Sequence, residues 1–286
     1  MVSVPHRLLT LPSVDVLHEG PDLVVVRKRL AAPVIERPSC LSMHALSLVS
    51  EGEQVVYDQA GSRIRIGPGA AGLMRRDLYT VTDLLAGETG GFATTVVFFS
   101  DALARRAAAP GTPAGGEAAR TRDAGRSRVS PALQYLSPRP TFATWPAHAI
   151  AAAGRLGARA DGAGIAGAVV TLLAESGADL GALLERPRRS LREFMRAHFD
   201  KPLSISDYAY LTGRSTRSFR RDFAARFGES PKRWLVARRL ERARELLRRG
   251  EVDTVSGAAR AVGYGSTSHF IARYRERYGE TPMRDR

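Results

Sequence analysis

Apolar residues recur at every fourth position in two stretches near the C-terminus, and each pattern predicts a helix with one buried side. They are Phe219, Phe223 and Phe227 in the first stretch and Phe270, Tyr274 and Tyr278 in the second. A shorter apolar pattern precedes each stretch, followed by a glycine that can end a helix and a serine that can cap the next one. Two short helices joined in this way form a helix-turn-helix, which we predict at about 204–228 and again at 255–279.

A fixed offset of 51 residues relates the two stretches. It separates three matching pairs, namely Ser215 and Ser266, Phe219 and Phe270, and Gly228 and Gly279. A constant offset marks one supersecondary unit used twice. Residues 231–247 between them predict one helix, which at about 1.5 Å per residue spans roughly 25 Å. Such a spacer could hold two recognition helices about one DNA turn, roughly 34 Å, apart.

The N-terminal region, residues 1–102, has a different pattern. Short runs rich in β-branched and aromatic residues alternate with turn residues, which predicts strands at 23–26, 45–49, 54–57, 63–66 and 94–99. Many short strands at this spacing favour a sandwich or small barrel. The chain is therefore expected to be α+β, with a β-domain followed by an all-α domain over 187–286.

The segment between these regions is expected to begin as a flexible linker or loop over 103–146. It is rich in Ala, Gly, Pro and Arg, and it contains Pro131, Pro138, Pro140 and Pro146, which argue against a helix. Helical periodicity returns over 147–186. The apolar faces of these helices could cover the β-domain or form a dimer contact, and the sequence leaves both readings open.

Charge separates the two halves of the chain. The formal net charge is +14, and residues 187–286 hold 24 of the 43 Lys and Arg residues but only 12 of the 29 Asp and Glu residues. This asymmetry favours a polyanionic partner for the C-terminal region alone. A helical bundle with a solvated basic face would explain the charge, but it would not explain the repeat.

The C-terminal residues resemble the AraC/XylS family of bacterial transcription regulators. The resemblance rests on Ser215, Phe219, Arg221, Phe223, Gly228 and Pro231, continues through Gly263, Ser266, Phe270 and Tyr274, and ends at Gly279 and Pro282. It implies a domain of seven helices that binds promoter DNA and works with RNA polymerase, and helices before this domain that commonly form a homodimer. By position, it implies that the first unit presents Thr216, Arg217, Arg220 and Arg221 to DNA and that the second presents Thr267, Ser268, His269 and Ala272. Arg273, in the same helix as the second set, is also predicted to bind DNA.

The N-terminal region resembles the cupin-like barrel that precedes the DNA-binding domain in many members of this family. Residues 51–53, the Arg75-Arg76 pair and Trp234 are also similar to the branch that activates type III secretion genes, the ExsA-like branch. The resemblance implies a sensing domain whose signal is either a regulatory protein or a small-molecule effector. The sequence leans towards a protein signal because it shows no sugar-binding or metal-binding cluster.

The sequence offers no candidate catalytic residue, metal ligand set or cofactor site. A cupin enzyme would need clustered histidines with a carboxylate, whereas the histidines here are scattered and none lies between Gly52 and Gly91. We therefore expect a non-enzymatic, sequence-specific regulator that activates transcription. The alternatives are a non-specific architectural DNA-binding protein, whose binding would depend on salt and not on sequence, and a DNA-targeted cupin enzyme.

The remaining features point to the cytoplasm, with the chain on the nucleoid when it binds DNA. The first twenty residues lack the apolar run of a signal peptide. No apolar stretch is long enough to cross a bilayer. The single cysteine, Cys40, fits a reducing compartment.

Overall fold

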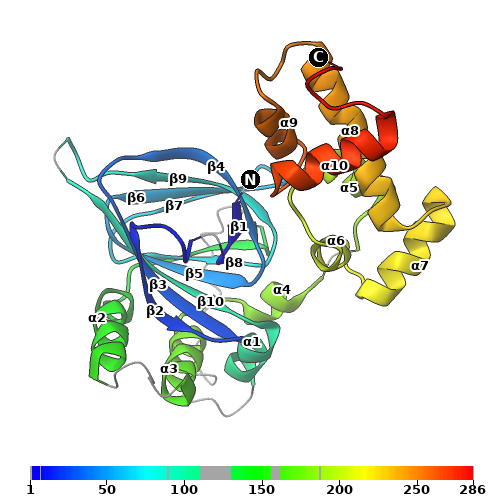
Figure 1. Ribbon diagram of the computed structural model, residues 1–286. Coiled ribbons are helices and arrows are strands. Elements are labelled where there is room, and N and C mark those ends of the chain that lie inside the picture. Colours follow the sequence, from blue (N-terminus) through cyan, green and yellow to red (C-terminus); the bar gives the residue numbers. More distant parts are fainter. Residues whose placement is uncertain are drawn as a thin grey trace. The chain divides into compact units, whose positions relative to one another are not determined.

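The chain divides between Glu185 and Arg186 in the computed structural model, giving the units Val2–Glu185 and Arg186–Arg286. The structure describes residues 2–6, 8–88, 90–109, 130–155, 162–186 and 188–285. Within these residues no helix is both long enough and apolar enough to cross a membrane. Figure 1 shows the two units, which we describe in turn.

The N-terminal unit is a β-sandwich. Its strands are β1 (Val2–Val4), β2 (Val14–Glu19), β3 (Leu23–Leu30), β4 (Val34–Leu41), β5 (His44–Glu51), β6 (Glu53–Asp58), β7 (Arg63–Ile66), β8 (Ala71–Met74), β9 (Leu78–Leu84), β10 (Phe92–Phe99) and β11 (Leu133–Leu136). One sheet has the order β1-β4-β9-β6-β7 and the other the order β11-β8-β5-β10-β3-β2. All paired strands are antiparallel except β1 and β4.

Alternation along the strands divides the apolar residues between two cores, because successive side chains point to opposite faces of a sheet. In β10, Val96 and Phe98 face the other sheet, whereas Val97 and Phe99 face a layer of helices. That layer contains α1 (Asp101–Ala108), α2 (Pro140–Arg155), α3 (Gly162–Glu175) and α4 (Leu180–Leu184). These helices cover the outer face of the six-stranded sheet, as Figure 1 shows for α1, α2 and α3.

The linker predicted over 103–146 needs correction. Helix α1 and strand β11 are ordered parts of the N-terminal unit, and α2 begins at Pro140 and includes Pro146. Residues 110–129 of the predicted linker lie outside the described residues. The apolar faces of α3 and α4 lie against the sandwich, which supports the covering role that the sequence left open. Dimerisation stays a prediction.

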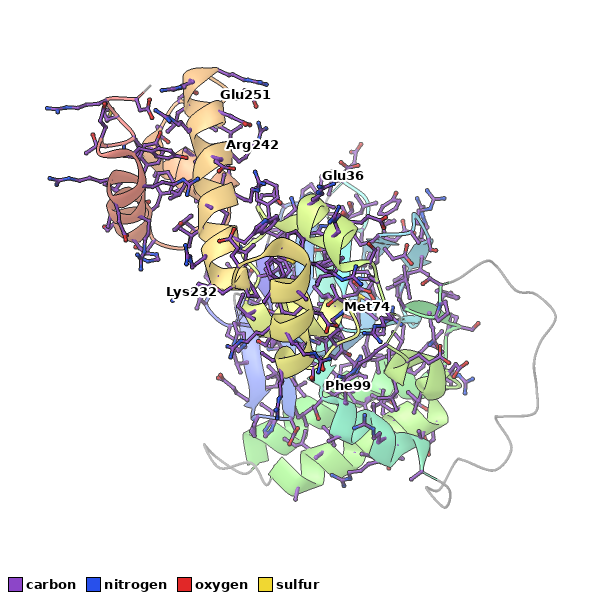
Figure 2. All side chains as sticks on the ribbon, turned by 90° about the vertical axis from the view of Figure 1, so that its right-hand side faces the viewer. Glu36, Met74, Phe99, Lys232, Arg242 and Glu251 are labelled. Carbon is purple, nitrogen blue, oxygen red and sulfur yellow. The ribbon has the colours of Figure 1, made fainter. Side chains whose placement is uncertain are left out.

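The C-terminal unit is all helical. It contains α5 (Leu191–His198), α6 (Ile205–Leu211), α7 (Thr216–Phe227), α8 (Pro231–Arg248), α9 (Val255–Ala261) and α10 (Thr267–Tyr278). The expectation of seven helices is wrong for the described part, residues 188–285, which holds six, because the chain forms turns after Gly279. In Figure 2 the label of Lys232 marks the start of α8, and the label of Glu251 marks the chain just after its end.

Each helix pair has its own aromatic and aliphatic core. Phe219 and Phe223 of α7 are fully buried beside Tyr208 of α6. Phe270 and Tyr274 of α10 are fully buried with residues of α8 and α9. The two equivalent helices, α7 and α10, are thus each anchored by the spacing of four that the sequence displays, and their other sides remain exposed.

Candidate nucleic-acid interface

Helix α7 has a defined start and end. The Ser215 hydroxyl accepts a hydrogen bond from the Ser218 backbone N–H at 3.1 Å, which satisfies one of the free amides of the first turn. Gly228 ends the helix in the left-handed conformation, with φ of 75°, which glycine adopts without steric cost. Phe219 and Phe223 are buried, so they set the rotation of α7 about its axis. This rotation decides which residues project from its outer side.

The outer side of α7 carries the arginines predicted for this helix. Arg217, Arg220 and Arg221 are exposed, and at about 100° per residue they point to one side of the helix. Thr216 begins the same helix and is half-buried. Neither Arg217 nor Arg220 has a hydrogen bond or ion pair within the described part of the chain, so both guanidinium groups are available to a ligand.

Asp222 partly neutralises the third arginine. Its carboxylate accepts hydrogen bonds from Arg214 Nε at 3.2 Å and Arg221 Nη2 at 3.3 Å. Burial alone would raise the pKa of Asp222, but the hydrogen bonds from Arg214 and Arg221 outweigh that effect and leave the pKa below its ordinary value. Arg221 is therefore tied to its neighbour, whereas Arg217 and Arg220 are not.

Helix α10 presents a less basic outer side. Ser268 and His269 are exposed and Thr267 is half-buried, as is Ile271 one turn further along the helix. The ring of His269 lies 5.7 Å from that of Tyr264. These side chains offer hydroxyl and imidazole groups where α7 offers guanidinium groups.

Arg273, the last predicted residue, lies on a different side of α10. It points about 140° away from Ser268 around the helix axis, bonds Glu276 at 2.7 Å, and lines a groove against Val236 and Ala237 of α8. Arg275 points within about 20° of Ser268 and is exposed. Sequence reasoning overlooked Arg275, although its spacing of seven from Ser268 marks the same side of a helix.

Arg239 of α8 ties the two helix pairs together. Its guanidinium donates to the Phe199 carbonyl at 2.7 Å and to the Lys201 carbonyl, both in the loop after α5, and to the Gly263 carbonyl at 3.4 Å. Gly263 has φ of 82°, and a Cβ at this position would lie 2.6 Å from the Asp200 carbonyl oxygen. The loop between α5 and α6 therefore packs directly on the turn between α9 and α10, and Arg239 holds both loops to α8.

A helix-turn-helix family model matches residues 208–286. The C-terminal region is 34% identical over 107 residues to the transcriptional regulator ExsA of Pseudomonas aeruginosa, covering 37% of this chain and 38% of ExsA. It is also 34% identical over 101 residues to the virulence regulon activator VirF of Yersinia enterocolitica, covering 35% of this chain and 37% of VirF. The C-terminal unit is an AraC-type helix-turn-helix domain. The chain thus matches little more than a third of the length of these relatives.

Among solved structures, fatty-acid-bound ToxT from Vibrio cholerae aligns with 93% of this chain and 95% of its own, at 10% identity and a TM-score of 0.39. An AraC-type regulator from Chromobacterium violaceum aligns with 34% of this chain and 85% of its own, at 34% identity and a TM-score of 0.30.

The last residues of the AraC-type domain clamp α8 to α10. The Asp285 carboxylate accepts hydrogen bonds from Arg244 and Arg248 of α8 and from the Tyr274 hydroxyl of α10 at 2.7 Å. Its side chain is only 8% exposed. The hydrogen bond from Arg244, followed by those from Tyr274 and Arg248, holds the pKa of Asp285 well below its ordinary value although burial acts in the opposite direction.

The interior of the sandwich that precedes the AraC-type domain contains a buried polar network beside a small cavity. Lys28 and Asp83 form a buried ion pair, and Gln54 Nε2 donates to Asp83 at 2.8 Å. Burial lowers the pKa of Lys28, and the Asp83 charge opposes this effect. The cavity beside these groups measures about 50 Å³, whereas small-molecule pockets usually measure about 300–1,000 Å³.

Proposed function

We propose that this chain is a sequence-specific transcription regulator that activates promoters. Helices α7 and α10 each present an outer side of polar residues, and the hydrogen bonds of Arg239 to the loops before α6 and α10 support one fixed arrangement of the two helices. A helix-turn-helix places its second helix in the major groove. The two helices would then enter successive major grooves on one face of the duplex, and because their outer residues differ, one chain would read an asymmetric site.

The observation that carries this proposal is the pair Arg217 and Arg220. Both are exposed on a helix whose ends and inner side are fixed, and the described residues give neither of them a partner. An arginine in the major groove can donate two hydrogen bonds to guanine O6 and N7, which distinguishes guanine from other bases by about 1–3 kcal/mol. A rigid helix with two such groups is suited to reading sequence as well as binding phosphate.

The N-terminal unit would receive the signal that controls the regulator, and we infer that this signal is a protein. The sandwich interior is occupied by the Lys28–Asp83–Gln54 network and leaves little room for a small-molecule effector. A purified protein that binds this unit and changes promoter occupancy would support the inference. A small molecule that alone produces the same change would contradict it. RNA polymerase is the expected partner at the promoter, in the bacterial cytoplasm on the nucleoid.

The test is genome-wide binding followed by footprinting of the best promoter at two salt concentrations. The proposal expects protection over two adjacent major grooves and a preference for that promoter that persists at the higher salt concentration. A footprint that covers all sequences alike and disappears uniformly with salt would contradict the proposal, because phosphate contacts alone behave in this way. It would identify a non-specific architectural protein.

A further inference from the structure

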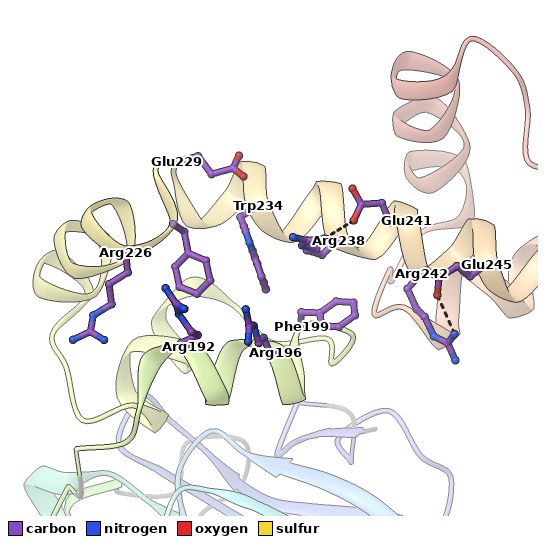
Figure 3. A pocket seen from close by; sticks show the side chains of 11 residues that line it. Arg192, Arg196, Phe199, Arg226, Glu229, Trp234, Arg238, Glu241, Arg242 and Glu245 are labelled. Atoms are coloured by element: carbon purple, nitrogen blue, oxygen red, sulfur yellow. Dashed lines mark hydrogen bonds and ion pairs between the residues drawn. The ribbon is translucent and has the colours of Figure 1, made fainter.

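The AraC-type domain contains a groove of about 590 Å³ between α5, the end of α7 and α8. Its floor consists of Phe199, Phe227 and Trp234, and Figure 3 shows Trp234 descending from α8 towards α5. The Trp234 ring lies edge-on to the other two, with centroids 6.2 Å from Phe199 and 5.1 Å from Phe227. The three rings hold one another in place, so the floor is a preformed apolar surface.

The two walls of the groove differ in charge. Arg192 and Arg196 of α5 and Arg226 of α7 are exposed, and they form no hydrogen bond or ion pair with any described residue. On the α8 side, the arginines are neutralised by glutamates one turn away, Arg238 by Glu241 at 2.9 Å and Arg242 by Glu245 at 3.2 Å, as the dashed lines in Figure 3 mark. One wall therefore has three positive charges without a partner among the described residues, and the α8 side, which Glu229 extends at its start, has no net positive charge.

The groove does not belong to the surface that we assign to DNA. Arg226 points about 180° away from the common direction of Arg217, Arg220 and Arg221 around α7. The α8 side of the groove offers a phosphate backbone no net attraction, because its glutamates cancel its arginines, whereas a protein segment can place its acidic side chains on the other wall alone. This arrangement favours a protein ligand over a second stretch of nucleic acid.

We propose that the groove binds an acidic segment of a partner protein. Carboxylates of the segment pair with Arg192, Arg196 and Arg226, because a guanidinium can hold a carboxylate through two parallel hydrogen bonds. A bulky apolar side chain of the segment lies on the aromatic floor, and such anchors and arginines carry most of the energy of protein interfaces. The proposal rests on the function proposed above, because it takes the opposite side of α7 to lie on DNA.

The test uses the full chain and short synthetic peptides, with binding followed by fluorescence anisotropy. One peptide carries Asp and Glu around a central Leu-Phe pair, and the other has the same charge but serines in place of the apolar pair. We expect the first peptide to bind more tightly, and the variant R196Q/R226Q to weaken that binding about tenfold or more. The control variant R249Q/R260Q removes the same charge from exposed positions that do not line the groove and should change binding by less than about twofold.

Three results would overturn the proposal: equal binding of the two peptides, equal loss in the control variant, or no loss in R196Q/R226Q. The first two would mean simple attraction to a basic domain. The same variants are tested on promoter DNA, where R196Q/R226Q should retain its sequence preference. A separate variant, R217A/R220A, should lose that preference and still bind the peptide. A third combination separates the two proposals. If the unmodified chain shows no sequence preference on DNA but R196Q/R226Q still weakens peptide binding, the proposed function is wrong and the proposed peptide-binding groove is supported.

Discussion

At the residue scale, the arginines of α7 differ in their availability to DNA. Arg217 and Arg220 have no partner among the described residues, whereas Arg221 is bonded to Asp222. We expect Arg217→Ala and Arg220→Ala each to weaken specific binding by about 1–3 kcal/mol and to relax the preference at one or two base pairs. Binding-site selection with the purified variants measures both effects. Equal weakening on all sequences would show that the two arginines contact phosphate instead.

We expect the stability of the N-terminal unit to depend on pH through His44. It is fully buried in β5, its Nε2 lies 3.0 Å from Asp101 Oδ1, and its Nδ1 accepts from the Arg76 backbone N–H at 3.2 Å. Burial lowers the pKa of His44, and the Asp101 carboxylate opposes this effect. Since the unfolded chain keeps a histidine pKa near 6.5, it takes up a proton below that pH before the folded chain does.

The stability that depends on neutral His44 is therefore complete above about pH 6.5 and is lost as the pH falls towards the folded pKa, by at most about 1.4 kcal/mol per pH unit. Urea unfolding of the full chain between pH 8 and 5 measures this loss, and His44→Gln, which keeps one donor and one acceptor, should flatten the curve. Burial also lowers the pKa of His18, so the difference between the wild-type and variant curves isolates His44. Identical curves would contradict the assignment.

At the scale of elements, Asp285 shows how a residue outside any helix stabilises two of them. We expect Asp285→Asn to remove the charge that Arg244 and Arg248 share and to raise hydrogen exchange in α10 roughly tenfold, while α7 is unaffected. Because the folded pKa of Asp285 is depressed, its contribution is present above the unfolded pKa near 3.8 and is lost as the pH falls below it. If hydrogen exchange rises equally in α7 and α10, the contacts of Asp285 stabilise the whole domain and not α10 in particular.

The elements that could be predicted from sequence are those whose pattern is local and regular. The spacing of Phe219 and Phe223 and the caps at Ser215 and Gly228 sufficed for α7. Strand β4 was missed because it contains Pro38 and a register shift between Val34 and Arg37. Strand β8 was missed because Gly72 looks like a turn residue, whereas in the structure a Cβ there would lie 2.2 Å from an Ile66 methyl group.

The prolines were over-weighted in the linker prediction. Pro140 is the first residue of α2, a position where a proline costs a helix little. The linker prediction also did not use Ser100 and Asp101, which form a capping signal for α1. For the candidate site, periodicity identified the outer sides of α7 and α10. Periodicity also separates Arg275 from Arg273, because Arg275 lies seven residues from Ser268 and Arg273 only five, but the prediction did not use that spacing.

At the scale of the whole DNA-binding domain, the decisive quantity is the fixed separation of α7 and α10. We expect Arg239 and Gly263 to maintain it, since Arg239 bonds three loop carbonyls and Gly263 packs on the Asp200 carbonyl. An alanine at Gly263 must adopt φ of 82° and displace that loop, a change that costs about 1–3 kcal/mol. We expect Gly263→Ala to keep protection of one major groove and to lose the adjacent one in footprinting.

The same rigidity predicts how the DNA site must be spaced. Inserting about half a helical turn, roughly five base pairs, between the two halves of the site moves the second half to the opposite face of the duplex. Because both recognition helices belong to one chain and α8 does not stretch, we expect the unmodified protein to protect only one half of such a site. Inserting a full turn should not restore the second half, since about 34 Å is added. Full protection of either spaced site would mean that two chains, and not two helices of one chain, occupy the promoter.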